Sequence, residues 1–146
     1  MTHAYAQLDL AGRVALITGG GTGIGREIAR LLAARGADLV LAARRADRLE
    51  EAAELIRGES GRKVSIHSAD VTDPEAARAM IEAAAGDFGR IDLLINNAGR
   101  GTHAPLRTMD PAVWQKDVAL NLNAAFYCSQ AAYPHLKAAG KSASSD

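Results

Sequence analysis

One stretch decides the fold of this chain: Thr18-Gly19-Gly20-Gly21-Thr22-Gly23-Ile24-Gly25. It directly follows the apolar run Val14 to Ile17 and directly precedes a segment with helical periodicity. Because a helix N-terminus carries unpaired backbone N–H groups and a partial positive charge, a glycine turn at this point can hold a phosphate. Gly19 can take the positive φ of a tight turn, Gly23 lets backbone approach a pyrophosphate, and Gly25 lets the helix lie close on its strand. The alternative is a plain surface turn, which the strand-to-helix context disfavours.

Composition excludes several classes of protein. The chain has 146 residues, 48% of them apolar, which is enough for one domain with a buried core. It carries 17 basic and 17 acidic residues, so no net charge attracts nucleic acid or an anionic membrane. No apolar run approaches the roughly 20 residues of a membrane span and no secretory signal pattern is visible, so we expect a cytoplasmic protein. One cysteine and four scattered histidines give no metal-ligand spacing, and we expect no metal.

Apolar runs with the length of strands alternate with segments of helical periodicity along the whole chain. The strands are expected at residues 14–18, 39–42, 64–69 and 91–95, and a last long helix is expected to begin at Asp110-Pro111. In the first helix, Ile24, Ile28, Leu31 and Leu32 share one face. This alternation predicts an α/β fold with a doubly wound parallel sheet of strand order 3-2-1-4. We expect residues 1–146 to form a single domain, with a leader at 1–11 and a mobile tail at 138–146.

The glycine spacing T-G-x-x-x-G-x-G resembles the signature of the short-chain dehydrogenase/reductase family. Three further stretches match that family in the same order: Asp70-Val71 after the third strand, Asn96-Asn97-Ala98-Gly99 after the fourth, and Trp114 to Leu122, which is similar to W-x(3)-V-x(2)-N-L. The resemblance runs from about Leu10 to Lys137. It implies a Rossmann-type domain that binds NAD(P), with the chain ending after the fourth helix.

The resemblance also implies roles for individual residues. The Asp70 carboxylate would meet the adenine amino group, although it can equally serve as local turn chemistry. The small residues after Asn97 would leave room for the nicotinamide ribose, the alternative being a plain Asn-Gly type turn. Asn121 falls on the family's catalytic asparagine, whose backbone carbonyl positions a water, although an Asn in a helix is usually a solvated or packing residue. The residues expected to bind the cofactor are Thr18, Gly19, Gly21, Thr22, Gly23, Ile24, Arg44, Asp70, Val71, Asn97, Ala98 and Gly99.

The end of the second strand indicates which dinucleotide is preferred. A dinucleotide fold usually carries a carboxylate there, but this chain reads Leu41-Ala42-Ala43-Arg44-Arg45. A carboxylate would repel a 2′-phosphate, whereas a guanidinium can bind it through two parallel hydrogen bonds and stack on adenine. We therefore expect Arg44 to favour NADP(H) over NAD(H). The alternative is that Arg44, Arg45 and Arg48 form a solvated basic face.

The serine, tyrosine and lysine that the family uses for proton transfer have no counterpart in these residues. Tyr133 and Lys137 fit Y-x(3)-K as a string, but Pro134 lies between them and the segment ends the Asn121 helix, so we expect no catalytic role for the pair. The resemblance implies a parent reaction in which hydride passes between nicotinamide and a carbonyl or alcohol substrate of unknown identity. We expect this chain alone to be inactive. The alternatives are a non-catalytic NADP(H)-binding module and a truncated product without function.

Incomplete sheets expose apolar surface. The strand at residues 91–95 would be interior in a complete doubly wound sheet and is expected to be an uncovered edge here. The last helix carries Trp114, Phe126 and Tyr127, which are expected to be partly exposed. We therefore expect self-association or a homo-oligomer.

Overall fold

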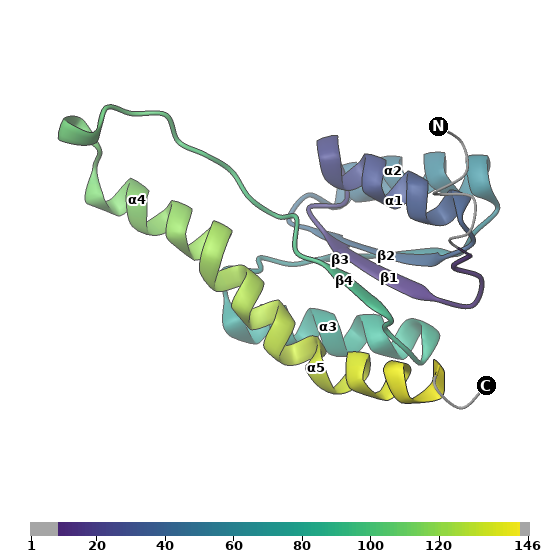
Figure 1. Ribbon diagram of the computed structural model, residues 1–146. Helices are drawn as coiled ribbons and strands as arrows, with labels where there is room; N and C mark the ends of the chain where they lie inside the picture. Colours follow the sequence, from purple (N-terminus) through teal and green to yellow (C-terminus); the bar gives the residue numbers. More distant parts are fainter. Residues whose placement is uncertain (1–8, 144–146) are drawn as a thin grey trace, which may run out of the picture.

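The computed structural model describes residues 9–143, which form a parallel β-sheet with helices on both faces (Figure 1). The sheet order β3-β2-β1-β4 confirms the predicted topology and the doubly wound α/β fold. Every neighbouring pair is parallel, as right-handed strand–helix–strand crossovers require. The third and fourth strands are shorter than expected. The strands are β1 Val14–Thr18, β2 Asp38–Ala43, β3 Val64–Ser68 and β4 Leu93–Ile95.

Helices α1 (Gly23–Ala34) and α2 (Ala46–Ser60) cover one face of the sheet, and α3 (Pro74–Phe88) and α5 (Ala124–Ala143) cover the other (Figure 1). The helix expected from Asp110 is present, and the Asp110 carboxylate caps it by accepting the amide of Ala112 at 2.8 Å. It is interrupted, however, by a π-helical turn, so that it comprises α4 (Pro111–Val118), η2 (Ala119–Asn123) and α5.

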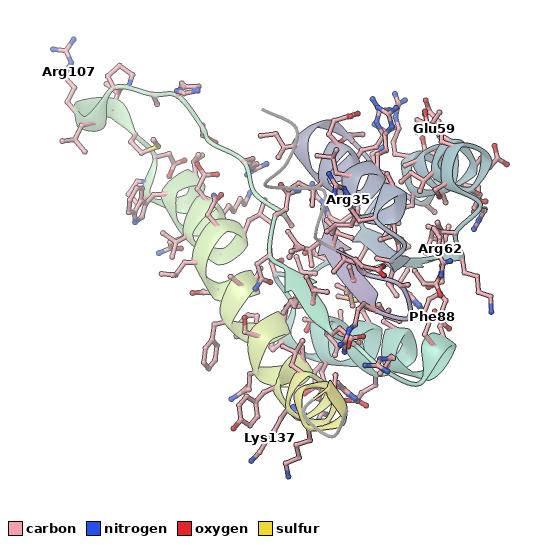
Figure 2. All side chains as sticks on the ribbon, turned by 45° about the vertical axis from the view of Figure 1, so that its right-hand side comes forward. Arg35, Glu59, Arg62, Phe88, Arg107 and Lys137 are labelled. Carbon is pink, nitrogen blue, oxygen red and sulfur yellow. The ribbon has the colours of Figure 1, made fainter. Side chains whose placement is uncertain are left out.

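The first part of this helix stands away from the sheet. Helix α4 and the short 3-10 helix η1 (Leu106–Thr108) have no buried residue, and Figure 2 shows Arg107 at the far tip of the molecule. At the other end, residues 138–143 continue helix α5, although a mobile tail was expected from residue 138. Residues 144–146 of that tail, like residues 1–8 of the leader, lie outside the described part. No helix in residues 9–143 combines the length and apolar character needed to cross a membrane.

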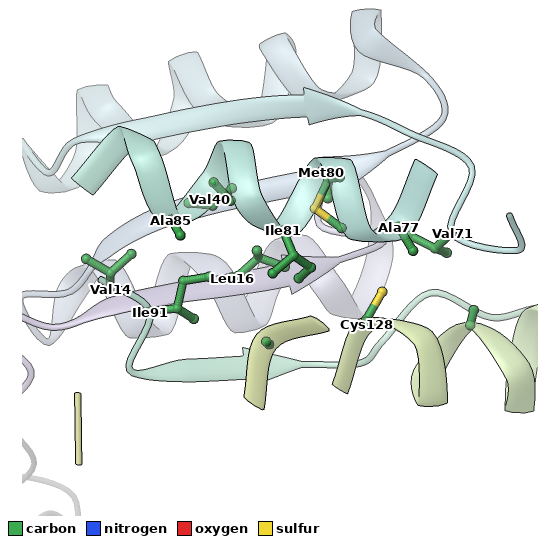
Figure 3. Close-up of a cluster of buried hydrophobic side chains, with 14 residues drawn as sticks. Val14, Leu16, Val40, Val71, Ala77, Met80, Ile81, Ala85, Ile91 and Cys128 are labelled. Carbon is green, nitrogen blue, oxygen red and sulfur yellow. The ribbon is translucent and has the colours of Figure 1, made fainter. Parts of the chain in front are cut away.

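Two apolar clusters lie on opposite faces of the sheet. The cluster under α3 and α5 is drawn in Figure 3, where Leu16 of the sheet meets Ile81 of α3, with Cys128 of α5 close by. Cys128 is buried, and burial raises the pKa of its thiol to about 11, so the thiol stays protonated and unreactive at neutral pH. The second cluster joins β1 and β2 to α1 and α2. The sheet is therefore held from both sides, which fixes the positions of its strand ends.

Helix α1 contacts the sheet through small residues. Its buried positions are Gly25, Ala29 and Ala33, whereas Ile24 is 75% exposed and Leu31 is 67% exposed. The face that periodicity assigned to Ile24, Ile28, Leu31 and Leu32 is therefore not the face that packs most closely on the sheet. A Cβ atom at Gly25 would overlap the backbone of the preceding glycine loop, so the helix lies too close to β1 for larger side chains to fit between them.

At the amino end of the sheet, the carboxylate of Asp92 joins the starts of β1 and β4. One oxygen accepts the amide of Val14 at 2.9 Å, and both oxygens accept hydrogen bonds from the Arg90 guanidinium at 2.8 and 2.6 Å. Arg13 adds a further hydrogen bond at 3.1 Å. Burial alone would raise the pKa of Asp92, but the hydrogen bonds from Arg90, Val14 and Arg13 hold it below its ordinary value.

Candidate cofactor-binding site

The candidate site is a cavity at the carboxyl ends of the strands. It lies at the edge of the sheet where the helices that follow the neighbouring strands β1 and β4 pass to opposite faces. This is the place where open α/β sheets bind ligands. The cavity combines backbone from the glycine loop, the ends of β2 and β3, and the segment after β4, with one contribution from η2. Its lining residues are Gly19, Ala42, Ala43, Arg44, Ala69, Asp70, Val71, Ala98, Gly99 and Leu120.

The glycine loop ends in the uncapped start of helix α1. Thr22 is the N-cap residue in an extended conformation, but no side chain caps the helix, and its first turn contains no carboxylate. Gly19 and Gly23 have φ values of +68° and +53°, in the left-handed region that side chains disfavour. Ile24, the second helical residue, points its side chain into solvent and leaves the turn open. The amides of this turn are thus available to a phosphate group, which fits a pyrophosphate.

Close backbone packing fixes the shape of the loop. A Cβ atom on Gly19 would lie 2.8 Å from the Asn97 side-chain nitrogen, and one on Gly21 would lie 3.2 Å from backbone of Arg48 in α2. At Gly25 it would overlap the carbonyl of Gly19. A side chain at Gly19 or Gly25 would press on the loop and on Asn97, and one at Gly21 would press on the backbone of α2, so these three positions favour glycine.

Thr18 and Asn97 hold the loop against the end of β4. The Thr18 hydroxyl accepts the amides of Asn97 and Ala98 at 3.1 and 3.0 Å and donates to the Ile95 carbonyl at 3.4 Å. The Asn97 amide group donates to the carbonyls of Thr18 and Gly19 at 3.1 and 3.3 Å. Thr18 is 2% exposed, and its hydroxyl has used its one donor and both acceptor positions. Its side chain therefore shapes the loop and has no hydrogen-bonding capacity left for a cofactor.

The three arginines after β2 differ in their partners. The Arg45 guanidinium pairs with Asp47 at 2.8 Å, and that of Arg48 pairs with Glu51 at 2.9 Å. The exposed Arg44 guanidinium has no ion pair or hydrogen bond among residues 9–143, while its backbone carbonyl accepts from a serine of β3. Arg44 also lines the cavity. Of the three, Arg44 is the cation available to an incoming anion.

Asp70 and Val71 follow β3 on the same edge. One oxygen of the Asp70 carboxylate accepts the Thr72 amide at 3.0 Å and the Thr72 hydroxyl at 2.7 Å, which is the turn chemistry considered from the sequence. These hydrogen bonds, with a smaller effect of the Arg44 charge, hold the pKa of Asp70 below its ordinary value. The other carboxylate oxygen has no hydrogen-bond partner in the described part of the chain and can accept from a ligand. Val71 is buried and forms apolar wall of the cavity.

Asn121 lies in the π-helical turn and contacts the segment that follows Gly99. Its side-chain oxygen accepts the Arg100 amide at 3.2 Å, and its side-chain nitrogen donates to the carbonyls of Arg100 and Asp117 at 2.7 and 2.8 Å. A Cβ atom on Gly99 would lie 2.7 Å from the Asn121 oxygen, so a larger residue there would have to displace the Asn121 side chain. The structure therefore brings Asn121 to the same edge as the predicted nicotinamide end. π-Helical turns are frequent at functional sites.

Tyr133 and Lys137 lie on α5, away from this edge. Tyr133 is 62% exposed, the Lys137 ammonium lies 5.8 Å from the centre of its ring, and Figure 2 shows Lys137 pointing away from the sheet. Neither residue lines the cavity. Although Pro134 lies inside the helix as expected, the helix continues through it. The pair has no geometric relation to the site.

Comparisons with known proteins match this architecture. Residues 13–144 match the family model for short chain dehydrogenases. The chain belongs to the short-chain dehydrogenase/reductase family. An uncharacterized oxidoreductase from Staphylococcus saprophyticus is 42% identical over 86% of this chain and 50% of its own length. Cis-4-hydroxycyclohexanecarboxylate dehydrogenase from Sinomonas cyclohexanicum is 37% identical over 98% of this chain and 55% of its own length.

A solved structure also resembles the fold of this short-chain dehydrogenase/reductase. L-Sorbose reductase from Gluconobacter frateurii, complexed with NADPH and L-sorbose, has a TM-score of 0.86 and 37% identity, covering 90% of this chain and 50% of that chain. The chain thus has the NAD(P)-binding Rossmann-type fold of an oxidoreductase family. It spans about half the length of the curated relatives it matches.

Sequence reasoning missed two residues of the site. Leu120 lines the cavity from η2, and Asp117 accepts hydrogen bonds from Arg100 and Thr102. The partners of Asp117 are 17 and 15 residues away in the sequence, so no local spacing pointed to it.

Proposed function

We propose that this chain is the cofactor-binding part of an NADP(H)-preferring short-chain dehydrogenase/reductase. The observation that carries the preference is the Arg44 guanidinium, which has no ion pair among the described residues and stands at the end of β2, where a carboxylate would exclude a 2′-phosphate. The neighbouring Arg45 and Arg48 form ion pairs with Asp47 and Glu51, which argues against a basic face made of all three arginines. L-Sorbose reductase, which was solved with NADPH, supports the same choice.

The proposed cofactor spans the edge of the sheet from β3 to β4. Asp70 and Val71 receive the adenine, and Arg44 receives the 2′-phosphate of the adenosine ribose. The open amides at Thr22, Gly23 and Ile24 receive the pyrophosphate, where the helix dipole favours negative charge. Ala98 and Gly99 leave space for the nicotinamide ribose. Bound NADP(H) supplies or accepts the hydride.

The parent reaction proposed is hydride transfer between this cofactor and a carbonyl or alcohol. Asn121 is proposed to contribute to proton transfer at the nicotinamide end, where its side chain is held by three hydrogen bonds. Because these hydrogen bonds fix the helix turn that carries Asn121, they also fix its backbone carbonyl. The relatives named above act on a range of hydroxyl compounds by their names, and no residue of the described cavity selects one substrate.

The test is the ratio of NADPH to NADH affinity, measured by calorimetric titration for the wild type and for Arg44→Asp. Charge-assisted hydrogen bonds contribute about 1.5–3 kcal/mol, so the substitution is expected to weaken NADPH binding roughly 10- to 100-fold while NADH binding is kept or improved. Arg45→Gln is the matched control, because Arg45 is already paired with Asp47. A wild type that prefers NADH, or an Arg44→Asp variant with an unchanged ratio, contradicts the proposal.

A further inference from the structure

The segment that leaves the site after β4 has few attachments. No backbone–backbone hydrogen bond joins residues 99–104 to any other part of the described chain. Figure 1 shows the segment running out from the sheet toward η1 and returning along α4. Its position therefore depends on side-chain contacts.

Those contacts come from one turn of helix, at Asp117 and Asn121. One oxygen of the Asp117 carboxylate accepts the Arg100 guanidinium and the Thr102 hydroxyl, both at 3.2 Å, and the other accepts the Thr102 amide at 3.0 Å. Asn121 binds the amide and carbonyl of Arg100. The Asp117 side chain is 14% exposed, although α4 itself has no buried residue. We call Asp117, Asn121, Arg100 and Thr102 the latch.

The latch acts on the nicotinamide end of the proposed site. Gly99 precedes Arg100 directly, and a Cβ atom there would press on the Asn121 oxygen. Asn121 also donates to the backbone carbonyl of Asp117, so the two side chains and the segment form one network. The adenosine end, at Arg44, has no contact with Asp117 among the hydrogen bonds of residues 9–143. Loss of the latch would therefore move Gly99 and Asn121 directly, whereas it approaches the adenosine end through the Arg100 side chain, which lines a second cavity with Arg44 and Asp70.

We infer that Asp117 is a positioning residue, which holds Arg100 and Thr102 and thereby keeps Gly99 and Asn121 in place around the nicotinamide half of the cofactor. The inference rests on the proposed function. Asp117 is not a catalytic residue, because its carboxylate is engaged with Arg100 and Thr102 and does not line the cavity. Its effect is exerted through the backbone that it holds.

Two ligands separate this role from a general effect on folding. NADPH engages both ends of the proposed site, whereas 2′,5′-ADP engages only the adenosine end. Asp117→Ala removes charge-assisted hydrogen bonds and is expected to weaken NADPH about 5- to 30-fold, while 2′,5′-ADP affinity stays within about twofold. Asp117→Asn, which keeps acceptor capacity, is expected to fall between Asp117→Ala and the wild type. Gln115→Ala, an exposed neighbour on α4, is the matched control and should change neither affinity.

Hydrogen exchange tests the latch without any ligand. The Thr102 amide is expected to be protected in the wild type and to exchange at least about tenfold faster in Asp117→Ala, with amides of β1 unchanged. An unprotected Thr102 amide in the wild type overturns the inference. So does an Asp117→Ala variant that loses NADPH and 2′,5′-ADP affinity equally, or that loses neither. If the wild type binds neither ligand, the proposed function fails and the inference fails with it, a result distinct from failure of the variant alone.

Discussion

Replacing Thr18 with Val tests the connection between β1 and the segment after β4. The two side chains have nearly the same shape, so the substitution leaves no cavity and removes only the hydroxyl. That hydroxyl is the acceptor for the amides of Asn97 and Ala98 at 3.1 and 3.0 Å, in a residue that is 2% exposed. An orphaned buried donor costs about 1–3 kcal/mol. The Asn97 amide keeps a hydrogen bond to the Ile95 carbonyl at 3.0 Å, so the Ala98 amide is the donor that loses its acceptor, and we expect the free energy of unfolding to fall by about 1–3 kcal/mol.

The assay is urea unfolding followed by far-ultraviolet circular dichroism. With a slope of about 2 kcal/mol per molar urea, the expected loss lowers the midpoint by roughly 0.5–1.5 M. Thr18→Ser keeps the hydroxyl and loses one methyl group, so its loss is expected to be about 1 kcal/mol. NADPH affinity should fall in Thr18→Val and be kept in Thr18→Ser, because the glycine loop is held through this hydroxyl. Equal midpoints for the two variants would refute the reasoning, since they would show that the hydroxyl bonds contribute nothing.

Three further predictions follow from other parts of the fold. Gly25→Ala should destabilise the fold by about 1–3 kcal/mol and weaken NADPH binding, because the added methyl group displaces the backbone of the glycine loop. Gly58→Ala, in open space on α2, is the control and should be neutral or stabilising in the same urea and calorimetric measurements. Asp92→Asn should lower the free energy of unfolding at neutral pH. Because the folded state lowers the pKa of Asp92, the difference in unfolding free energy between wild type and variant should shrink as pH falls below about 4. A difference that stays constant with pH would contradict this prediction. Trp114 and Phe126 are 60% and 58% exposed and β4 is an edge strand, so sedimentation at micromolar concentration should show self-association that Phe126→Ser reduces; a clean wild-type monomer would contradict this.

The order of elements was predictable because each signal is local. The apolar run Val14 to Ile17, the glycines after it and the alternation of strands and helices require no knowledge of distant contacts, and the sheet order that they indicated is confirmed. The site edge followed from topology, since carboxyl ends of parallel strands lie together. Arg44, Asp70 and Gly99 were therefore expected at one edge, and all three line the same cavity.

The features that could not be predicted from the sequence depend on how closely helix α1 approaches the sheet and on contacts between residues far apart in the chain. Periodicity placed Ile24 and Leu31 on one face of α1, but Gly25 brings the helix so close to β1 that small side chains occupy the face toward the sheet. The π-helical turn around Asn121 has no signal in residue pattern. The contacts of Asp117 with Arg100 and Thr102 arise only when the chain doubles back.

The central claim is that these residues form a cofactor site with a preference for NADP(H). The most direct measurement is calorimetric titration of the purified chain with NADPH and, separately, with NADH at one fixed salt concentration. We predict binding of NADPH in the micromolar range and weaker binding of NADH, because the Arg44 guanidinium, unlike those of Arg45 and Arg48, has no ion pair within residues 9–143 and can pair with the 2′-phosphate. Tighter binding of NADH, or no binding of either dinucleotide, would contradict the account.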